Sequence, residues 1–230
     1  MKPVSYFYDH PSSGEGHFPQ KFCTLFATAV RVIFKVLFRY RVYGLENLKG
    51  LPEGSGAIIV GNHSSYLDPV FVIAALRPRP IRYISKEEFF NFNPLIGRLA
   101  AWVGAFPVRR NSGDMSAIKR AVRMLKRGEL VGIFPEGTRV RSKDQEVTYH
   151  EGISLISQLA NVPVIPVRLW GPDRICPKGA RLFRLPKVTL RFGEPLSVHE
   201  ERFAVLSKEE RLTAFTAEAM ARVYDLEFPR

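Results

Sequence analysis

His63 and Asp68 stand five positions apart and could act together as an acid–base pair. An imidazole has an ordinary pKa of about 6.5, so it can accept a proton near neutral pH. A neighbouring carboxylate can hold one ring nitrogen and stabilise the positive charge that forms when the other nitrogen is protonated. The pair therefore predicts a histidine general base oriented by an aspartate. A purely structural role for Asp68, as a helix cap, remains the alternative.

The residues around this pair predict how the two side chains come together. Residues 57–60 are apolar and mostly β-branched, which is typical of a buried strand. Asp68 precedes Pro69; aspartate is favoured at a helix N-cap and proline fits the first helical position. We therefore expect a strand, a loop that carries His63, and a helix that begins at Pro69.

Composition limits the class of protein. The 230 residues are 46% hydrophobic and 24% charged, which suits one globular domain with a sizeable core. The net charge of +12 favours an anionic partner, which could be acidic lipid, nucleic acid or an acidic protein. Cys23 and Cys176 have no motif spacing, so we expect reduced thiols rather than a disulfide scaffold.

Residues 21–42 form an apolar segment with a narrow polar stripe. Residues 1–20, rich in proline and glycine, predict a flexible lead-in and do not resemble a signal peptide. Arg31, Lys35 and Arg39 recur at steps of four and share one side of a predicted helix. Such a helix can lie in a membrane interface or pack on the core of its own domain. We favour an amphipathic helix that holds the chain at the cytoplasmic face of a membrane.

Strands and helices alternate through residues 43–230, the segment assigned to the main domain. The pattern predicts an α/β fold: a single layered domain with a largely parallel central sheet flanked by helices. Further strands are expected at residues 81–85, 104–110, 130–134, 164–167 and 188–192.

Three polar turns follow predicted strands, at residues 62–63, 109–110 and 136–139. The carboxyl ends of parallel neighbouring strands meet at one edge of a sheet, where ligands bind. The turns would then bring together a base, several cations, a carboxylate and a hydroxyl. This combination suits deprotonation of a hydroxyl on a molecule that carries phosphate.

Four sequence blocks carry a resemblance to a known family. They read NHSSYLD at residues 62–68, GAFPVR at 104–109, FPEGTR at 134–139 and VPVIPV at 162–167. Their order and spacing resemble those of the PlsC-like glycerolipid acyltransferases, in particular the 1-acylglycerol-3-phosphate acyltransferases. The resemblance covers about residues 42–195, and the pairing of H-x4-D with FPEGTR is its most specific part.

The resemblance implies a reaction. His63 would remove a proton from the free sn-2 hydroxyl of lysophosphatidic acid, with Asp68 orienting the ring. The hydroxyl oxygen would then attack the thioester of acyl-CoA or acyl carrier protein, giving phosphatidic acid for phospholipid synthesis. Thioester cleavage drives the transfer, so no cofactor, ATP or metal is implied.

The resemblance also implies a set of substrate-binding residues. Arg109 and Arg139 would hold the acceptor phosphate, and Lys86 would assist that site. Glu136 and Gly137 would help to shape the glycerol pocket, and Thr138 belongs to the same substrate-binding set. Where the family often has a lysine, this chain has Tyr149 and His150, so we expect His150 to be a surface histidine.

Several alternatives remain open. The acceptor could be glycerol-3-phosphate, another lysophospholipid or a lyso-ornithine lipid, and water in its place would make the protein a thioesterase. Ser64 and Ser65 adjoin His63 but lack a G-x-S-x-G elbow. No H-E-x-x-H pattern favours zinc. Cations are spread along the chain without a zinc-finger or RNA-binding signature, so we expect an anionic membrane surface, and no nucleic acid, as the partner.

Overall fold

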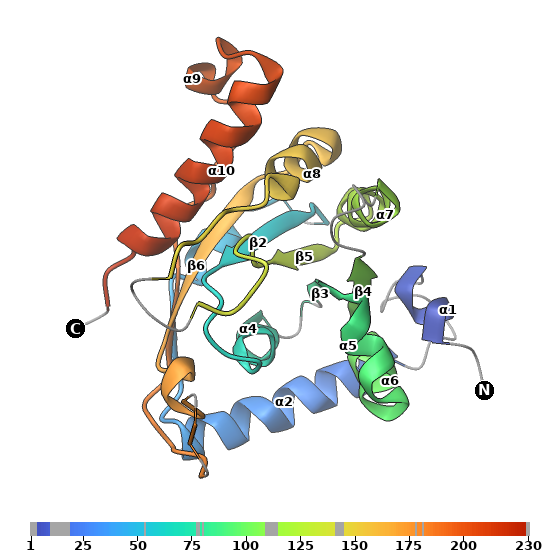
Figure 1. Ribbon diagram of the computed structural model, residues 1–230, viewed down its shortest axis with the longest axis vertical. Helices are drawn as coiled ribbons and strands as arrows, with labels where there is room; N and C mark the ends of the chain where they lie inside the picture. The colour runs from blue at the N-terminus through green and yellow to red at the C-terminus, as the bar shows by residue number, and fades with distance from the viewer. Residues whose placement is uncertain are drawn as a thin grey trace.

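A seven-stranded sheet lies at the centre of the molecule (Figure 1). The computed structural model of the chain describes residues 4–9, 19–52, 54–76, 79, 81–108, 115–140, 145–177, 179–180 and 182–228. The strands are β1 (Arg41–Tyr43), β2 (Ala57–Gly61), β3 (Ile81–Lys86), β4 (Ala105–Val108), β5 (Leu130–Ile133), β6 (Val164–Trp170) and β7 (Thr189–Phe192).

The strands lie in the order β1-β7-β6-β2-β5-β3-β4. Pairing is parallel throughout except between β6 and β7, so β1 and β7 run opposite to the other five strands. The predicted largely parallel sheet is confirmed. The carboxyl ends of β2, β5 and β6 therefore meet at one edge of the sheet, which is where ligands bind in open α/β folds.

Helices cover both faces of the sheet (Figure 1). Side chains alternate along a strand, so Ala57 and Ile59 of β2 belong to one core while Ile58 and Val60 belong to the other. The first core is covered by α2 (Pro19–Leu37), α4 (Asp68–Leu76), α5 (Glu87–Phe92) and α6 (Pro94–Trp102). The second is covered by α7 (Met115–Lys126), α8 (Gly152–Ala160), α9 (Glu201–Ala204) and α10 (Lys208–Asp225). The remaining short elements are α1 (Val4–Asp9), α3 (Glu46–Lys49) and η1 (Pro172–Arg174).

Helix α2 ends at Leu37, earlier than the segment 21–42 that the sequence predicts as helical. Arg39 takes a left-handed backbone conformation with φ of 46°, which a continuing helix does not allow. Tyr40 is then buried, and its hydroxyl donates to the carbonyl of Phe71 at 2.6 Å. Arg41 already belongs to β1, so the sheet begins inside the segment predicted as helix.

The two roles considered for α2 fall on different faces of the same helix. Phe34 packs against Phe71 of α4, with ring centroids 4.1 Å apart, so one face belongs to the core. The opposite face is apolar and exposed, at Leu25, Val32, Ile33, Val36 and Leu37. None of the helices in the described part of the chain has the length and apolar composition needed to cross a bilayer.

The last helix, α10, begins with a capping box formed by Ser207 and Glu210. The Ser207 hydroxyl accepts from the Glu210 backbone N–H at 3.3 Å, and the Glu210 carboxylate accepts from the Ser207 N–H at 3.0 Å. This reciprocal capping box satisfies two donors at the helix start. The helix then packs on α8 and β6 and brings its final turn to the edge of the sheet where β2 ends.

Candidate active site

His63 lies in the loop between β2 and α4, where the sequence predicts it. Its Nδ1 is 3.0 Å from Oδ2 of Asp68, the first residue of α4. A carboxylate only accepts hydrogen bonds, so Nδ1 is assigned the proton and Nε2 of the neutral ring keeps its lone pair. The His63 side chain is 18% exposed. The structure therefore brings the predicted pair together in the tautomer that a general base requires.

Asp68 is fully buried and organises the whole loop. Its Oδ2 also accepts from the backbone N–H of Ser64 at 2.6 Å and of Ser65 at 2.7 Å. The carboxylate thus turns back onto the loop before the helix, rather than only capping the helix that follows. Such charge-assisted bonds contribute roughly 1.5–3 kcal/mol each, and they hold the buried charge in one place.

An aromatic stack fixes the plane of the His63 ring. The Phe134 ring lies almost parallel to it, with centroids 4.5 Å apart and an interplanar angle of 18°. Tyr83 stacks on the far side of Phe134, at 5.7 Å and 12°. Phe134 follows β5 and Tyr83 belongs to β3, so residues from two neighbouring strands orient the His63 ring.

The FPEGTR segment holds the backbone of His63 on both sides. The His63 N–H donates to Oε2 of Glu136 at 2.7 Å, and the His63 carbonyl accepts from the Val140 N–H at 2.8 Å. Gly137 has a φ of 62°, and its N–H bonds the Phe134 carbonyl at 3.0 Å, so a tight turn requires glycine there. This segment therefore holds the backbone of His63 in place.

Glu136 is buried, and both of its carboxylate oxygens are engaged. Oε1 accepts from the Tyr224 hydroxyl of α10 at 2.5 Å, while Oε2 holds His63. Burial raises the pKa of Glu136, and the bonds from Tyr224 and His63 lower it in part. Burial and the neighbouring carboxylate raise the pKa of Tyr224, so the phenol keeps its proton and remains a donor.

Arg139 lies over the exposed ring of Tyr66, with its guanidinium carbon 3.5 Å from the ring centroid. Tyr66 belongs to the same loop as His63, so Arg139 contacts the loop that carries His63. Because stacking uses the flat face of the guanidinium, the N–H groups around its edge can still bind an anion. Thr138 is exposed next to Arg139.

One of the predicted cations, Lys86, lies at the end of a strand. Lys86 is the exposed last residue of β3 and pairs in register with Val108, the last residue of β4. Arg109, Arg110 and Arg141 lie outside the described residues. His150 is exposed, as expected for a surface histidine.

Two positioning residues were not singled out from the sequence. The side chain of Asn62 bonds both backbone groups of Leu169, accepting from its N–H at 2.8 Å and donating to its carbonyl at 3.1 Å. It thereby ties the His63 loop to β6, and its place in the first sequence block was the available signal. Tyr224 lies far from every block, and no local pattern marks it.

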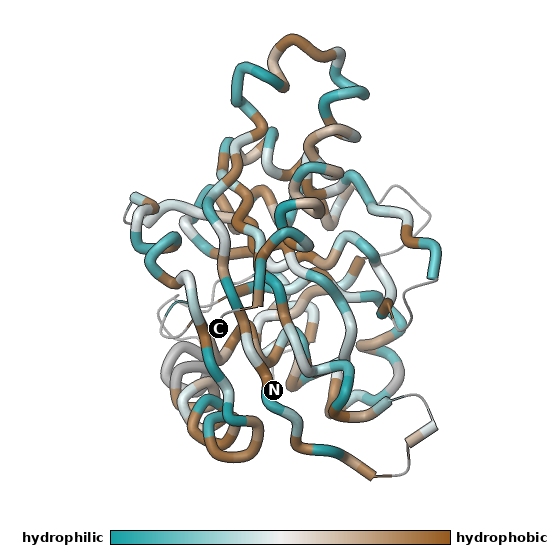
Figure 2. The backbone as a smooth tube through the Cα atoms, turned by 90° about the vertical axis from the view of Figure 1, so that its left-hand side faces the viewer, coloured by the Kyte–Doolittle hydropathy of each residue, from teal (hydrophilic) through white to brown (hydrophobic). Residues whose placement is uncertain are grey.

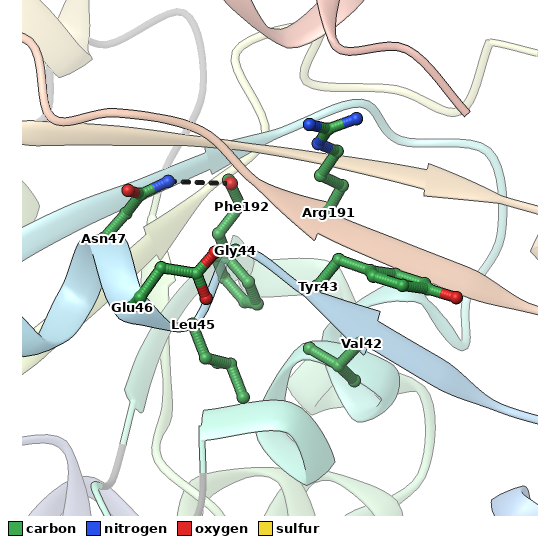
Figure 3. Close-up of a pocket in the computed structure, with 8 residues that line it drawn as sticks. All are labelled: Val42, Tyr43, Gly44, Leu45, Glu46, Asn47, Arg191 and Phe192. Carbon is green, nitrogen blue, oxygen red and sulfur yellow. Dashed lines mark hydrogen bonds between the residues drawn. The ribbon is translucent and has the colours of Figure 1, made fainter. Parts of the chain in front are cut away.

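The cavity drawn in Figure 3 is a separate feature. It measures about 480 Å³ and is lined by residues 42–47 and by Arg191 and Phe192. It lies at the edge strand β1, which β7 and β6 separate from β2. In the part of the chain that is described, no group of three or more His, Cys, Asp or Glu side chains could hold a metal ion.

The chain is similar in sequence to known proteins. The family described as Acyltransferase matches residues 39–170. The chain is 37% identical over 207 residues to the 1-acyl-sn-glycerol-3-phosphate acyltransferase of Bacillus subtilis (strain 168), covering 90% of this chain and 96% of that protein. It is 33% identical over 144 residues to the protein of the same name from Streptococcus pneumoniae, covering 62% of this chain and 51% of that one.

A solved structure shares the fold. The crystal structure of the 1-acyl-sn-glycerophosphate (LPA) acyltransferase PlsC from Thermotoga maritima aligns with a TM-score of 0.65 at 24% identity. The alignment covers 91% of this chain and 82% of that chain. The sequence match and the shared fold lead to one conclusion: the chain belongs to the acyltransferase family.

Proposed function

We propose that this protein transfers a fatty acyl group from an acyl thioester to the sn-2 hydroxyl of 1-acyl-glycerol-3-phosphate, giving phosphatidic acid. The contact of 3.0 Å between His63 Nδ1 and the buried Asp68 carboxylate carries the proposal, because it leaves Nε2 able to take a proton. The names of the relatives from Bacillus and Streptococcus support the acceptor. Acyl-CoA and acyl carrier protein are both candidate donors.

The reaction needs one base and no covalent enzyme intermediate. Nε2 of His63 takes the proton of the acceptor hydroxyl as its oxygen bonds to the thioester carbonyl carbon. The tetrahedral intermediate then collapses, the carbon–sulfur bond breaks, and the proton passes from His63 to the leaving thiolate. Asp68 stabilises the imidazolium between these steps, and general acid–base catalysis of this kind contributes about 10²–10⁴ in rate.

The acceptor phosphate would bind beside the base. Arg139 lies over Tyr66, two residues before Asp68 begins α4, so its free guanidinium edge is close to the loop that carries His63. Arginine presents paired donors that match phosphate oxygens. Lys86 and Arg109 are the further cations that the sequence pattern assigns to this role.

The loop serines support transfer rather than serine hydrolase chemistry. The Ser65 hydroxyl accepts from the Leu67 N–H at 3.3 Å, and the Ser64 hydroxyl lies 3.5 Å from Asp68 Oδ1. Both hydroxyls thus belong to the hydrogen bonds that shape the loop. Neither has a described contact with His63 of the kind that activates a nucleophilic serine.

We also propose that the outer face of α2 holds the protein at the cytoplasmic face of a membrane. That face exposes large apolar side chains, and burying each in an interface stabilises binding by about 1.5–3 kcal/mol at most. The net charge of +12 adds attraction to the anionic lipids of that leaflet.

The first experiment measures thiol release and phosphatidate formation together, in mixed micelles of lysophosphatidate with palmitoyl-CoA or palmitoyl carrier protein. We expect equal amounts of both products. His63→Ala should lower the rate by ~10² or more with the fold intact by circular dichroism. His199→Ala, which removes an exposed histidine, is the matched control and should keep full activity.

Other outcomes would change the assignment. Thiol release without phosphatidate would indicate a thioesterase, and transfer only to another lysolipid or to glycerol-3-phosphate would replace the acceptor. Full activity in His63→Ala would remove this residue as the base. The membrane proposal is tested by flotation with anionic vesicles at physiological salt, where preference for added duplex DNA over vesicles would contradict it.

A further inference from the structure

The segment between β6 and β7 exposes an unusual group of apolar side chains. Leu182 and Phe183 are 80% and 78% exposed, and Leu185 is half exposed. Single exposed apolar residues are common on protein surfaces. Three exposed apolar residues within four positions form a patch of the kind that marks a binding surface. Residues 182–185 are called the apolar loop below.

The apolar loop lies against the end of α2. The Arg39 guanidinium donates to the Leu185 carbonyl at 3.1 Å. Val188 donates its N–H to the Phe38 carbonyl at 3.0 Å. Figure 1 shows this orange segment beside the C-terminal end of α2, and Figure 2 shows hydrophobic stretches of backbone at the lower end of the molecule. One end of the apolar loop is therefore tied to the residues that follow α2, near the exposed Val36 and Leu37.

The same segment starts at the candidate active site. It leaves β6 at Gly171, two residues after Leu169, which Asn62 holds next to His63. One end of the segment is thus tied to the loop of the base, and its apolar tip lies beside α2. A lipid acceptor whose head group reaches His63 while its chain stays in a bilayer would pass along this side of the molecule.

The charges around the apolar loop indicate which kind of surface it binds. Residues 171–187 contain five lysines or arginines and one aspartate. Arg174, Arg184 and Lys187 are exposed, and Arg39 joins them from the end of α2. Exposed apolar side chains with cations in the same segment match an anionic bilayer, where the apolar groups enter the acyl boundary and the cations stay among the head groups.

We propose that the apolar loop is a second membrane contact, which inserts Leu182 and Phe183 into an anionic bilayer beside α2. The inference rests on the proposed membrane location. A single helix in the interface leaves the protein able to roll about the helix axis. A second contact to one side of that axis prevents the rolling, and it fixes how the edge of the sheet that carries His63 faces the lipid.

The test places an environment-sensitive NBD label on single cysteines, in a chain whose Cys23 and Cys176 are replaced by serine. Phe183→Cys reports on the apolar loop and Val36→Cys on α2. Val205→Cys is the matched control, because Val205 is 83% exposed and lies at the connection between α9 and α10, at the opposite end of the molecule (Figure 1). With vesicles containing phosphatidylglycerol, we expect the labels at 183 and 36, but not at 205, to shift to the blue and to be quenched by brominated lipid.

A double variant tests the consequence. Leu182→Ser/Phe183→Ser should lower partitioning into the anionic vesicles roughly tenfold. It should reduce acyl transfer to lysophosphatidate embedded in those vesicles by a similar factor, while the rate with acceptor in detergent micelles stays within about twofold of wild type. Retained micellar activity shows that the variant is folded.

The outcomes separate the two proposals. Binding by wild type with a response at 36 but none at 183 would overturn the second contact and leave α2 as the membrane element. No vesicle binding by wild type would overturn both. A blue shift at 183 that appears on raising the protein concentration without lipid would assign the apolar loop to a second copy of the chain and overturn the membrane assignment.

Discussion

The loop that carries His63 and the outward face of α2 are organised in opposite ways. In the loop, three polar groups of His63 each have a partner of their own: Glu136 for the N–H, Val140 for the carbonyl and Asp68 for Nδ1. On α2, the outward apolar side chains are exposed and share one property, their apolar area.

This difference determines how each region should respond to substitution. A geometric site fails when one atom is wrong, because orientation and protonation depend on single contacts. A surface that acts through area loses a small amount with each side chain, and the losses at separated positions add. Substitutions in the two regions therefore test whether the chemistry and the proposed membrane contact are separable.

The largest effect after loss of His63 itself is expected at Asp68. Asp68→Asn should lower kcat by about 10² or more, because a neutral amide can still accept from Ser64, Ser65 and His63 at the Oδ2 position but no longer stabilises the imidazolium that forms when Nε2 takes a proton. Initial rates in micelles measure the change. Asp173→Asn, at an exposed aspartate, should be unaffected. An active Asp68→Asn would leave Asp68 with a structural role only.

A smaller effect is expected at Tyr224, which acts through Glu136. Tyr224→Phe removes the 2.5 Å bond to Oε1 and should lower kcat about threefold to tenfold with little change in the KM for acceptor. Because that bond lowers the pKa of Glu136, its loss should move the acid limb of the kcat profile to higher pH. Tyr43→Phe, on the edge strand β1, is the control. A uniform loss of activity without any pH shift would contradict the positioning role.

The sequence predicts the residues of the candidate site better than it predicts the residues that hold them in position. An apolar β-branched run followed by Asp68-Pro69 is a local signal, and it correctly places His63 between strand and helix. The Tyr224 contact with Glu136 joins residues 88 apart in the chain, and only the packed fold creates it. A surface tyrosine near the end of an amphipathic helix has no local feature that distinguishes it.

The same limit explains β1 and the two faces of α2. β1 has three residues and exists because Arg41 pairs with Thr189 of β7, so no local pattern identifies it. For α2, the sequence left membrane contact and core packing as alternatives. Phe34 packs on Phe71, so one face of α2 belongs to the core. The opposite face is exposed and is left for the proposed membrane contact.

Glu136 also gives a pH-dependent prediction for stability. Burial raises its pKa above the ordinary 4.5, so the folded state binds this proton more tightly than the unfolded state. Wild type should therefore lose stability as pH rises from 4.5 through the raised pKa. Glu136→Gln does not titrate, so its free energy of unfolding relative to wild type should improve as pH rises over that window. Urea unfolding at several pH values measures the free energy of unfolding of both proteins. A difference between the two that stays constant with pH would refute the prediction.

The smallest effect is expected on the outer face of α2. Val36→Ser should weaken partitioning into anionic vesicles only about threefold, because one exposed valine supplies a small part of the apolar area. Adding Val32→Ser should multiply the loss to about tenfold, while kcat in micelles stays within twofold of wild type. Vesicle flotation and micellar rates on the same samples measure both quantities. If the single change abolished vesicle binding, or if it lowered kcat in micelles as a change at Asp68 should, the two regions would not be separable. The outward face would then be part of the structure that positions His63 rather than a surface that acts through its area.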